Sequence, residues 1–208
     1  GRAVGFFFDG ATGFKRVLLA NPISSETLPG EFAQTYTNPM TIVPAIASSN
    51  EALYVYNQKN APLVIDGTPR ARIVRWTGNA WASLPELPIG GDITALLPEA
   101  DALTVALSGV LYTFRNGSWD TGVTLPAQTP VARTIVRDGN ALIMTLTSGG
   151  RDSVRKVFHL EDGVLQPLDD GVFVPEGGHG SLAVAQRWIY SIGSVASGSP
   201  WNDVVARW

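Results

Sequence analysis

Two acidic residues, Asp92 and Glu176, could form a catalytic pair if the fold brings them together. Asp92 follows Gly90-Gly91, Glu176 precedes Gly177-Gly178, and each stands before a stretch that we expect to form a strand. Hydrolysis of a glycosidic bond needs two carboxyl groups about 5 to 10 Å apart, one as acid and the other as nucleophile or base. Glycoside hydrolysis is therefore one hypothesis for this chain.

His179 is a second candidate for chemistry, because it lies among glycines that let the backbone approach a ligand closely. A histidine can act as a general base or bind a metal. A metal site needs further ligands, and Glu176 and His159 stand at no recognisable metal-binding spacing. We therefore expect His179 to be structural, exposed or in contact with a ligand, and we expect no metal, no cofactor and no catalytic residue.

Trp201 is a candidate for ligand binding of another kind. It is flanked by Pro200 and Asn202, and an exposed indole there would offer a flat face on which a sugar ring can stack. Packing between sheets is the simpler explanation, because tryptophan buries a large apolar area. The residue thus raises carbohydrate binding as a hypothesis without deciding it.

Composition excludes several classes of function. The chain has 208 residues, a net charge of −3 and no cysteine. It lacks the excess of basic residues expected of a protein that binds nucleic acid. Without cysteine, no disulfide, thiolate metal site or cysteine nucleophile can form. No stretch approaches the ~20 apolar residues that span a bilayer, and no signal-peptide core follows Gly1. We expect no membrane insertion and no nucleic-acid binding.

Five apolar segments recur along the chain and indicate the architecture. They begin at Ala3, Ala52, Ala102, Ala141 and Trp188, at intervals of 39 to 50 residues. A period of 40 to 50 residues is typical of β-propeller blades, each a four-stranded antiparallel sheet. We therefore predict an all-β propeller of about five blades over 1–208, as a single domain with repeats at about 1–36, 37–90, 91–126, 127–176 and 177–208.

The strands can be predicted within each repeat. The expected ranges are 3–8, 14–19 and near 27, then 52–58, 71–76 and 81–84, then 102–107, 110–115 and from 119, then 132–137, 141–147, 154–160 and from 164, and lastly 181–185, 188–192 and 203–208. Asn116-Gly117 is a hairpin signal because both central residues of a type I′ turn need positive φ. The first repeat lacks its first strand and the last lacks its fourth. Five closed blades and a part of a larger ring both fit this count.

Some segments resemble kelch repeats. The resemblance runs through Ile189 to Gly193, Asn202 to Val205, and Arg72 to Trp76 followed by Trp81 and Leu84-Pro85. It implies a propeller that serves as a binding platform, with Trp76, Trp81, Trp119 and Phe114 packed between blades. The copper enzymes of that group need a cysteine crosslinked to tyrosine and are excluded here. Lectins of the tachylectin-like five-repeat type remain open.

Ligands of propellers usually bind to loops on one face. In this chain those loops are expected at 58–70, 89–92, 148–153, 176–180 and 194–202, and the first strands beside them, at 41–43, 94–96, 134–136 and 182–184, are apolar. The candidate ligand-binding residues are the polar ones in the loops: Lys59, Asp66, Arg70, Asp92, Arg151, Asp152, Glu176, His179, Trp201 and Asn202. The leading hypothesis is a non-enzymatic recognition module for a protein or glycan. The alternatives are an attachment or structural domain of a larger assembly, extracellular, on a cell surface or in a virion, and a glycoside hydrolase.

Overall fold

The computed structural model describes residues 3–9, 14–21, 23–34, 44–120, 122–125, 131–147, 155–168, 181–185, 188–195 and 202–207. Every regular element within these ranges is a β-strand. Across the same ranges there is no helix with the length and apolar character needed to cross a membrane. The prediction of an all-β protein is confirmed.

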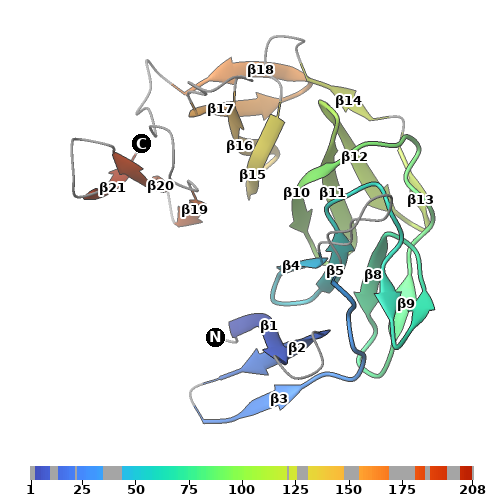
Figure 1. Ribbon diagram of the computed structural model, residues 1–208. Coiled ribbons are helices and arrows are strands. Elements are labelled where there is room, and N and C mark those ends of the chain that lie inside the picture. Colours follow the sequence, from blue (N-terminus) through green and yellow to red (C-terminus); the bar gives the residue numbers. More distant parts are fainter. Residues whose placement is uncertain are drawn as a thin grey trace. The chain divides into compact units, whose positions relative to one another are not determined.

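The strands form five successive antiparallel sheets, one in each predicted repeat (Figure 1). The first has the order β1 (Ala3–Asp9), β2 (Phe14–Ala20) and β3 (Ser25–Thr27), and the second the order β4 (Pro44–Ser48), β5 (Leu53–Asn57), β8 (Ile73–Trp76) and β9 (Trp81–Ser83). The third has β10 (Ile93–Pro98), β11 (Ala102–Leu107), β12 (Val110–Arg115) and β13 (Ser118–Trp119), with β14 (Val123–Thr124) also paired to β12.

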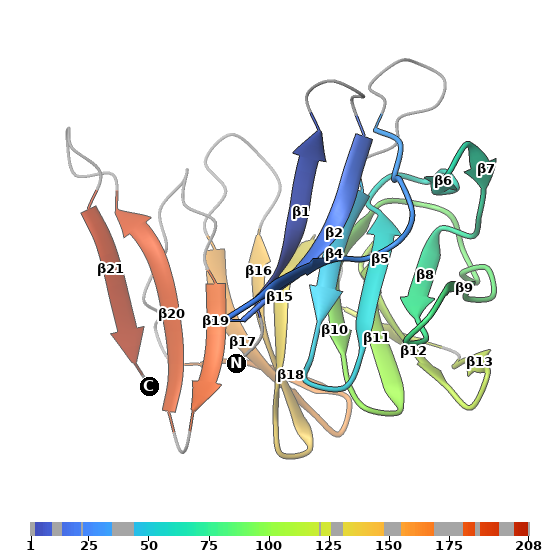
Figure 2. The ribbon, with the colours of Figure 1, turned by 90° about the horizontal axis from the view of Figure 1, so that it is seen from below.

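The fourth and fifth sheets continue the series. They contain β15 (Val131–Asp138), β16 (Ala141–Thr147), β17 (Arg155–Glu161) and β18 (Val164–Pro167), and then β19 (Ser181–Ala185), β20 (Trp188–Val195) and β21 (Asn202–Arg207). The antiparallel course of β20 and β21 is clear in Figure 2. Successive small sheets, each made of consecutive antiparallel strands, are the β-propeller arrangement. The predicted fold class is confirmed.

Hairpin turns separate several of these strands. Consecutive residues with positive φ occur at Ser108-Gly109, Asn116-Gly117 and Asp162-Gly163. In a two-residue turn this conformation matches the right-handed twist of the flanking strands. The turn predicted at Asn116-Gly117 is therefore present, with φ of 52° and 84°.

The first described strand of the second repeat is β4 at Pro44–Ser48. The strand that we expected at 41–43 lies outside the described residues. Pro44 pairs with Asn57 at the start of the strand. Proline is tolerated there because the first residue need not donate to the ladder. Pro44 is therefore compatible with its place in β4.

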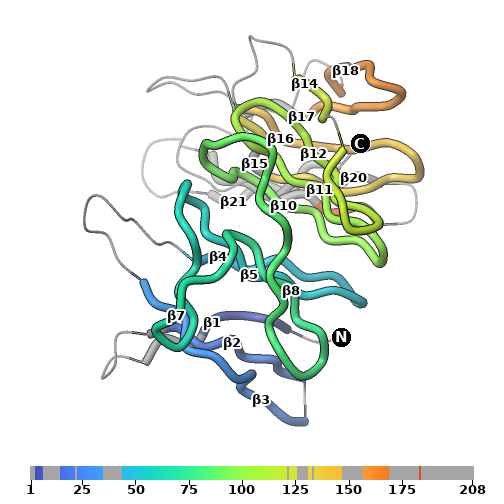
Figure 3. The backbone as a smooth tube through the Cα atoms, turned by 90° about the vertical axis from the view of Figure 1, so that its right-hand side faces the viewer, coloured from blue at the N-terminus to red at the C-terminus, as the bar shows by residue number. Residues whose placement is uncertain are grey.

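A hairpin occupies the segment that we expected to be an irregular loop at 58–70. It consists of β6 (Val64–Ile65) and β7 (Thr68–Pro69) (Figure 3), joined by Asp66-Gly67 with φ of 50° and 74°. Ile65 forms a bridge with Phe32, and the N–H of Ala33 donates to the carbonyl of Val64 over 3.0 Å. The loop expectation was wrong here, because contact with the first repeat orders the hairpin.

The residues group into two compact units. Unit 1 comprises Gly1–Ile93, Leu97–Thr104 and Thr113–Asp120, and unit 2 comprises Thr94–Leu96, Val105–Tyr112 and Thr121–Trp208. The buried cluster of unit 1 is formed by Val17, Leu28, Phe32, Leu53, Val55, Leu63, Ile65 and Val74. In unit 2, Ile143 and Val157 are buried together, with Val136 and Leu168 packed against them. The single-domain assignment stays a prediction.

Tryptophans of unit 1 join one repeat to the next. The indole N–H of Trp81 donates to the carbonyl of Pro29 over 2.7 Å, and that of Trp119 to the carbonyl of Pro85 over 3.1 Å. Trp81 also meets Phe32 edge-on, with ring centroids 5.2 Å apart. The N–H of each indole thus donates to a carbonyl of the preceding repeat. The apolar ring of an indole can pack while its polar N–H forms a hydrogen bond.

The leucines before these prolines explain why the carbonyls are held in place. Leu28 and Leu84 are 3% and 7% exposed. The backbone N–H of Leu28 donates to Val17 over 2.9 Å, and that of Leu84 donates to Ile73 over 3.0 Å. Leu168 makes the same bond to Val157 over 3.0 Å in the fourth repeat. A leucine that is buried at positions 28 and 84 and partly buried at position 168 therefore follows the last strand of each of these sheets.

Burial of two tyrosines predicts a pH dependence. Tyr54 and Tyr56, on β5, are 2% and 7% exposed. Loss of solvent raises the pKa of both, opposed for Tyr54 by the charge of Arg75 and for Tyr56 by a hydrogen bond to Gln58. The folded chain therefore keeps protons that the unfolded chain releases above pH 10.0. Their contribution to stability is present below that pH and is lost as the pH rises further.

We expect the phenolate absorbance to show this in an alkaline titration. Tyr54 and Tyr56 will ionise above pH 10.0 and together with unfolding. Tyr56→Phe will remove one of these two delayed ionisations. Ionisation of Tyr54 and Tyr56 near the free value in the folded chain would contradict the burial of β5.

Candidate functional site

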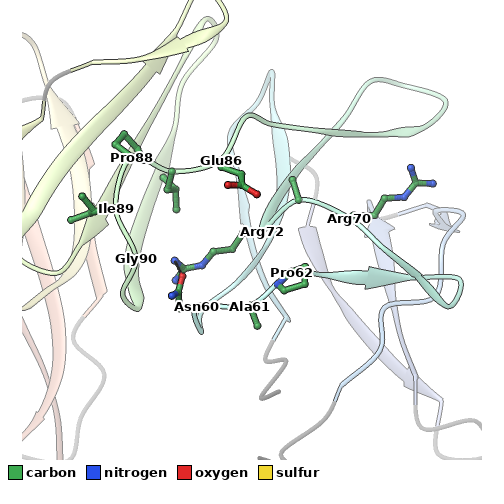
Figure 4. Close-up of a pocket in the computed structure, with 11 residues that line it drawn as sticks. Asn60, Ala61, Pro62, Arg70, Arg72, Glu86, Pro88, Ile89 and Gly90 are labelled. Atoms are coloured by element: carbon green, nitrogen blue, oxygen red, sulfur yellow. Dashed lines mark hydrogen bonds between the residues drawn. The ribbon is translucent and has the colours of Figure 1, made fainter. Parts of the chain in front are cut away.

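A pocket of about 390 Å³ opens on unit 1 (Figure 4). Three segments line it: residues 60–62 after β5, residues 70–72 before β8, and residues 86–90 between β9 and β10. The lining residues are Asn60, Ala61, Pro62, Arg70, Ala71, Arg72, Glu86, Leu87, Pro88, Ile89 and Gly90. We call it the Arg72 pocket.

The buried side chain of Asn57 shapes one wall. It is fully buried at 0% exposure. Its Nδ2 donates to the carbonyl of Ala61 over 2.9 Å, and its Oδ1 accepts the N–H of Lys59 over 3.1 Å. One amide therefore bonds to both ends of the turn at 59–61. This turn presents Asn60 to the pocket.

Arg72 spans the base of the same turn. Its Nε donates to the carbonyl of Asn57 over 3.1 Å, its Nη2 to the carbonyl of Gln58 over 3.1 Å, and its Nη1 to Oδ1 of Asn60 over 3.4 Å. In Figure 4 the side chains of Arg72 and Asn60 point toward one another. A guanidinium has five N–H donors, so these bonds leave two donors, one on each terminal nitrogen.

The charge of Arg72 is only partly balanced. All three of its hydrogen-bond acceptors are neutral oxygens, and no carboxylate of the described residues forms an ion pair with it. Burial lowers the pKa of Arg72 to about 10, while the more distant charge of Asp92 raises it. The side chain is therefore cationic at neutral pH in an environment that favours an added anion.

The pH dependence of this arginine runs opposite to that of the tyrosines. Below pH 10 Arg72 is charged in both the folded and unfolded states, so the cost of its burial is constant. Above pH 10 the folded state releases the proton while the unfolded state, with the higher pKa of an ordinary arginine, still holds it. The contribution of this group to stability therefore rises with pH in that window.

An ion pair connects the turn at 59–61 to the segment before β10. Lys59 Nζ lies 2.5 Å from Asp92 Oδ2, with the two side chains 47% and 50% exposed. The N–H of Ile93 donates to the carbonyl of Gln58 over 2.9 Å. A Cβ added to Gly90 would lie 3.0 Å from Nδ2 of Asn60. Glycine therefore allows the two segments to approach closely.

The predicted site residues fall in different places. The structure brings Lys59 and Asp92 together beside the pocket, and Arg70 lines it with a side chain that points away from Arg72 (Figure 4). Asp66 is at the tip of the β6–β7 hairpin, and Asn202 pairs with Val195 at the start of β21. The other predicted residues lie outside the described part of the chain: Arg151, Asp152, Glu176, His179 and Trp201. The proposed pairing of Asp92 with Glu176 therefore stays a prediction.

Arg72 and Glu86 were missing from the predicted set. Arg72 was assigned to a strand, and strand residues are expected to pack rather than to bind. The available signal was an arginine placed beside the buried pair Ile73-Val74 at the end of a loop. Glu86 follows Leu84-Pro85, and nothing in the sequence around it distinguishes a pocket residue from an ordinary solvent-exposed glutamate.

Metal binding finds no support in the part of the chain that the structure describes. No group of three or more histidine or acidic side chains there is placed to hold a metal ion. His159 lies on β17 with its Nε2 3.8 Å from Oε2 of Glu161. This contact involves one histidine and one carboxylate of the same strand.

Asp66 has a structural contact, which leads to a prediction. Its Oδ1 accepts the N–H of Glu31 over 2.8 Å, and its own N–H donates to the carbonyl of Glu31 over 3.0 Å. We expect Asp66→Ala to lower the free energy of unfolding by about 1 kcal/mol, because the N–H of Glu31 loses its acceptor. Asp66→Asn is the matched control and will change stability by less than about 0.5 kcal/mol, because asparagine accepts the same bond and tolerates positive φ. Chemical denaturation measures both, and equal losses would contradict this role.

Comparisons with known proteins bear on the fold. No protein-family model matches the chain, and no curated protein sequence matches it. Among solved structures, it is similar to the computationally designed protein Ika8, with a TM-score of 0.50 and 10% identity over 90% of this chain and 64% of that one. It is also similar to a chain in the structure of S. cerevisiae Dbp5 bound to Nup159, Gle1, IP6 and ADP, with a TM-score of 0.50 and 11% identity over 93% of this chain and 57% of that one.

A third solved structure, the N-terminal domain of Nup159, has a TM-score of 0.47 and 11% identity over 99% of this chain and 60% of that one. The chain thus spans less than two thirds of the length of each of the three chains. At this identity the first two likenesses show the fold alone. They agree with the propeller architecture, and no kelch family is identified.

Proposed function

We propose that this chain is a non-enzymatic recognition module that binds a protein partner through the Arg72 pocket. The observation that carries the proposal is the composition of the pocket, in which an incompletely balanced cation lies beside exposed apolar residues. Ile89 is 40% exposed, and Pro62 and Pro88 are also exposed. Such a mixture of apolar surface with a few polar groups is typical of binding sites.

The rigidity of the pocket supports the same proposal. Its walls are held by the bonds of Asn57 and Arg72 and by the contact between the turn at 59–61 and the segment before β10. A preorganised site loses less conformational entropy when a partner binds. The kelch-like character of the repeats, which we retain as part of the proposal, implies a binding platform as well.

Three alternatives stand beside the proposal. An attachment or structural domain of a larger assembly, on a cell surface or in a virion, would use the same surface for its protein contacts. A glycan ligand would instead depend on residues such as His179 and Trp201. The glycosidase hypothesis needs Asp92 free of its partner Lys59, to which it is bound in this structure.

The test is a selection of random peptides displayed on phage against the immobilised full chain. We expect peptides to be enriched that lose binding about tenfold or more when Ile89→Asp places a charge on the apolar rim. Ile23→Asp is the matched control, because Ile23 is 96% exposed and does not line the pocket. Peptides that bind both variants as well as the original chain would refute the pocket as the site. Failure to enrich any peptide would refute protein recognition, and binding on a glycan array would then favour the glycan alternative.

A further inference from the structure

We propose that the Arg72 pocket receives one aspartate or glutamate side chain of the partner, with apolar residues of the partner on either side of it. This inference rests on the proposed function and names the chemistry of the ligand. Its basis is the pair of donors that Arg72 keeps after binding Asn57, Gln58 and Asn60. A planar guanidinium with two remaining N–H groups suits a carboxylate, whose two oxygens can each accept a bond.

The charges of the pocket favour one carboxylate over a more highly charged group. The lining carries two arginines against one glutamate, a net charge of +1. Of the two arginines only Arg72 points toward Asn60, whereas the side chain of Arg70 points away from Arg72. Lys59 is already paired with Asp92 and adds no free cation beside it. A single carboxylate balances the lining, whereas a phosphate group with a charge of about −2 would leave excess negative charge near Glu86. The pocket therefore matches an acidic side chain better than a phosphorylated one.

Glu86 also limits which acidic sequences fit. Its side chain points toward the middle of the pocket (Figure 4), and it forms no ion pair with any described residue. A second acidic residue in the partner would be repelled by this carboxylate. We therefore expect an isolated acidic residue rather than an acidic run.

The apolar lining sets the neighbours of that residue. Pro62, Leu87, Pro88 and Ile89 surround the charged groups. Apolar side chains next to the acidic residue would cover this surface and exclude water, which strengthens the ion pair with Arg72. The ligand is thus a short segment with one carboxylate between apolar residues.

The experiment uses the peptides enriched on the full chain. Each enriched peptide is synthesised with a fluorescent label, alongside a version in which its acidic residue is replaced by the amide. We expect one fixed acidic position, and we expect the amide version to bind about tenfold more weakly. Arg72→Gln will remove this difference between the two peptides, whereas Arg75→Gln, on β8 and outside the pocket lining, will keep it.

Glu86→Gln provides a second arm, because Glu86 is exposed and its replacement leaves the hydrogen bonds of Arg72 in place. We expect the acidic peptides to bind about threefold more tightly to this variant through loss of like-charge repulsion. This arm decides the matter if Arg72→Gln fails to fold, and an unchanged or weaker affinity would then overturn the inference.

The outcomes separate the two proposals. Enriched peptides that need Ile89 but carry no fixed acidic residue, or that bind Arg72→Gln as well as the original chain, overturn the acidic ligand and leave the recognition module standing. Absence of any enriched peptide overturns both.

Discussion

Replacing Trp81 by alanine will lower the free energy of unfolding by about 3 to 5 kcal/mol, the cost typical of removing a large aromatic side chain from a packed site. The centroid of the Trp81 ring lies 5.2 Å from that of the Phe32 ring and 5.1 Å from that of the Trp76 ring. Its N–H also satisfies the carbonyl of Pro29. The variant loses this packing and this hydrogen bond together. Chemical denaturation followed by circular dichroism measures the effect.

Trp81→Phe separates the two contributions. The phenyl ring keeps most of the apolar contact and loses only the N–H donor, so we expect a loss of about 1 to 2 kcal/mol. Trp119→Phe is the matched control, because its indole makes the equivalent bond to the carbonyl of Pro85. A Phe variant of Trp81 as unstable as the Ala variant would show that the hydrogen bond, rather than packing, dominates this contact.

Gly122→Ala will be the second strongly destabilising change, at about 2 to 4 kcal/mol from overpacking and backbone strain together. Gly122 has φ of 78°, a conformation that alanine adopts only with strain. An added Cβ would lie 2.8 Å from Cε1 of Tyr112 and 2.8 Å from Cγ1 of Val110. Tyr112 is buried at 6% exposure and has little room to move. Chemical denaturation again provides the measurement.

Gly109→Ala isolates the backbone part of this cost. Gly109 has φ of 79°, almost the value at Gly122, but an added Cβ there would meet nothing within 4 Å. We expect a loss of about 1 kcal/mol, from conformational strain alone. Equal losses at the two glycines would refute the steric argument at Gly122 and leave only the shared backbone strain.

The strands of the third repeat show how much of the fold can be predicted from the local sequence pattern. The predicted ranges 102–107 and 110–115 coincide with β11 and β12. Ser108-Gly109 joins these two strands and Asn116-Gly117 follows the second, and short turns of this kind are specified by the residues within them. The sheet is less regular between β13 and β14. Asp120 lies there, and its Oδ1 accepts the N–H of Thr113, on β12, over 2.8 Å. This bond depends on a side chain, and strand periodicity does not reveal it.

The candidate site was predicted less well, because its residues come from three separate segments. Lys59, Arg70 and Asp92 are polar loop residues, and composition alone suggested them. Arg72 was missed because its role depends on carbonyl groups of Asn57 and Gln58, fourteen or more residues earlier in the chain. An arginine at the edge of a strand looks the same in sequence whether its side chain is solvated or bound.

By itself, the sequence determined the all-β class and turns such as Asn116-Gly117, since these depend on alternation of apolar residues and on residues that accept positive φ over short spans. Only the tertiary structure decided that residues 64–69 form a hairpin on the first repeat, that Asp66 bonds to Glu31, and that Arg72 lines a pocket. These features are contacts between distant segments. Their energies depend on which groups become neighbours after folding, and a local pattern carries no record of that.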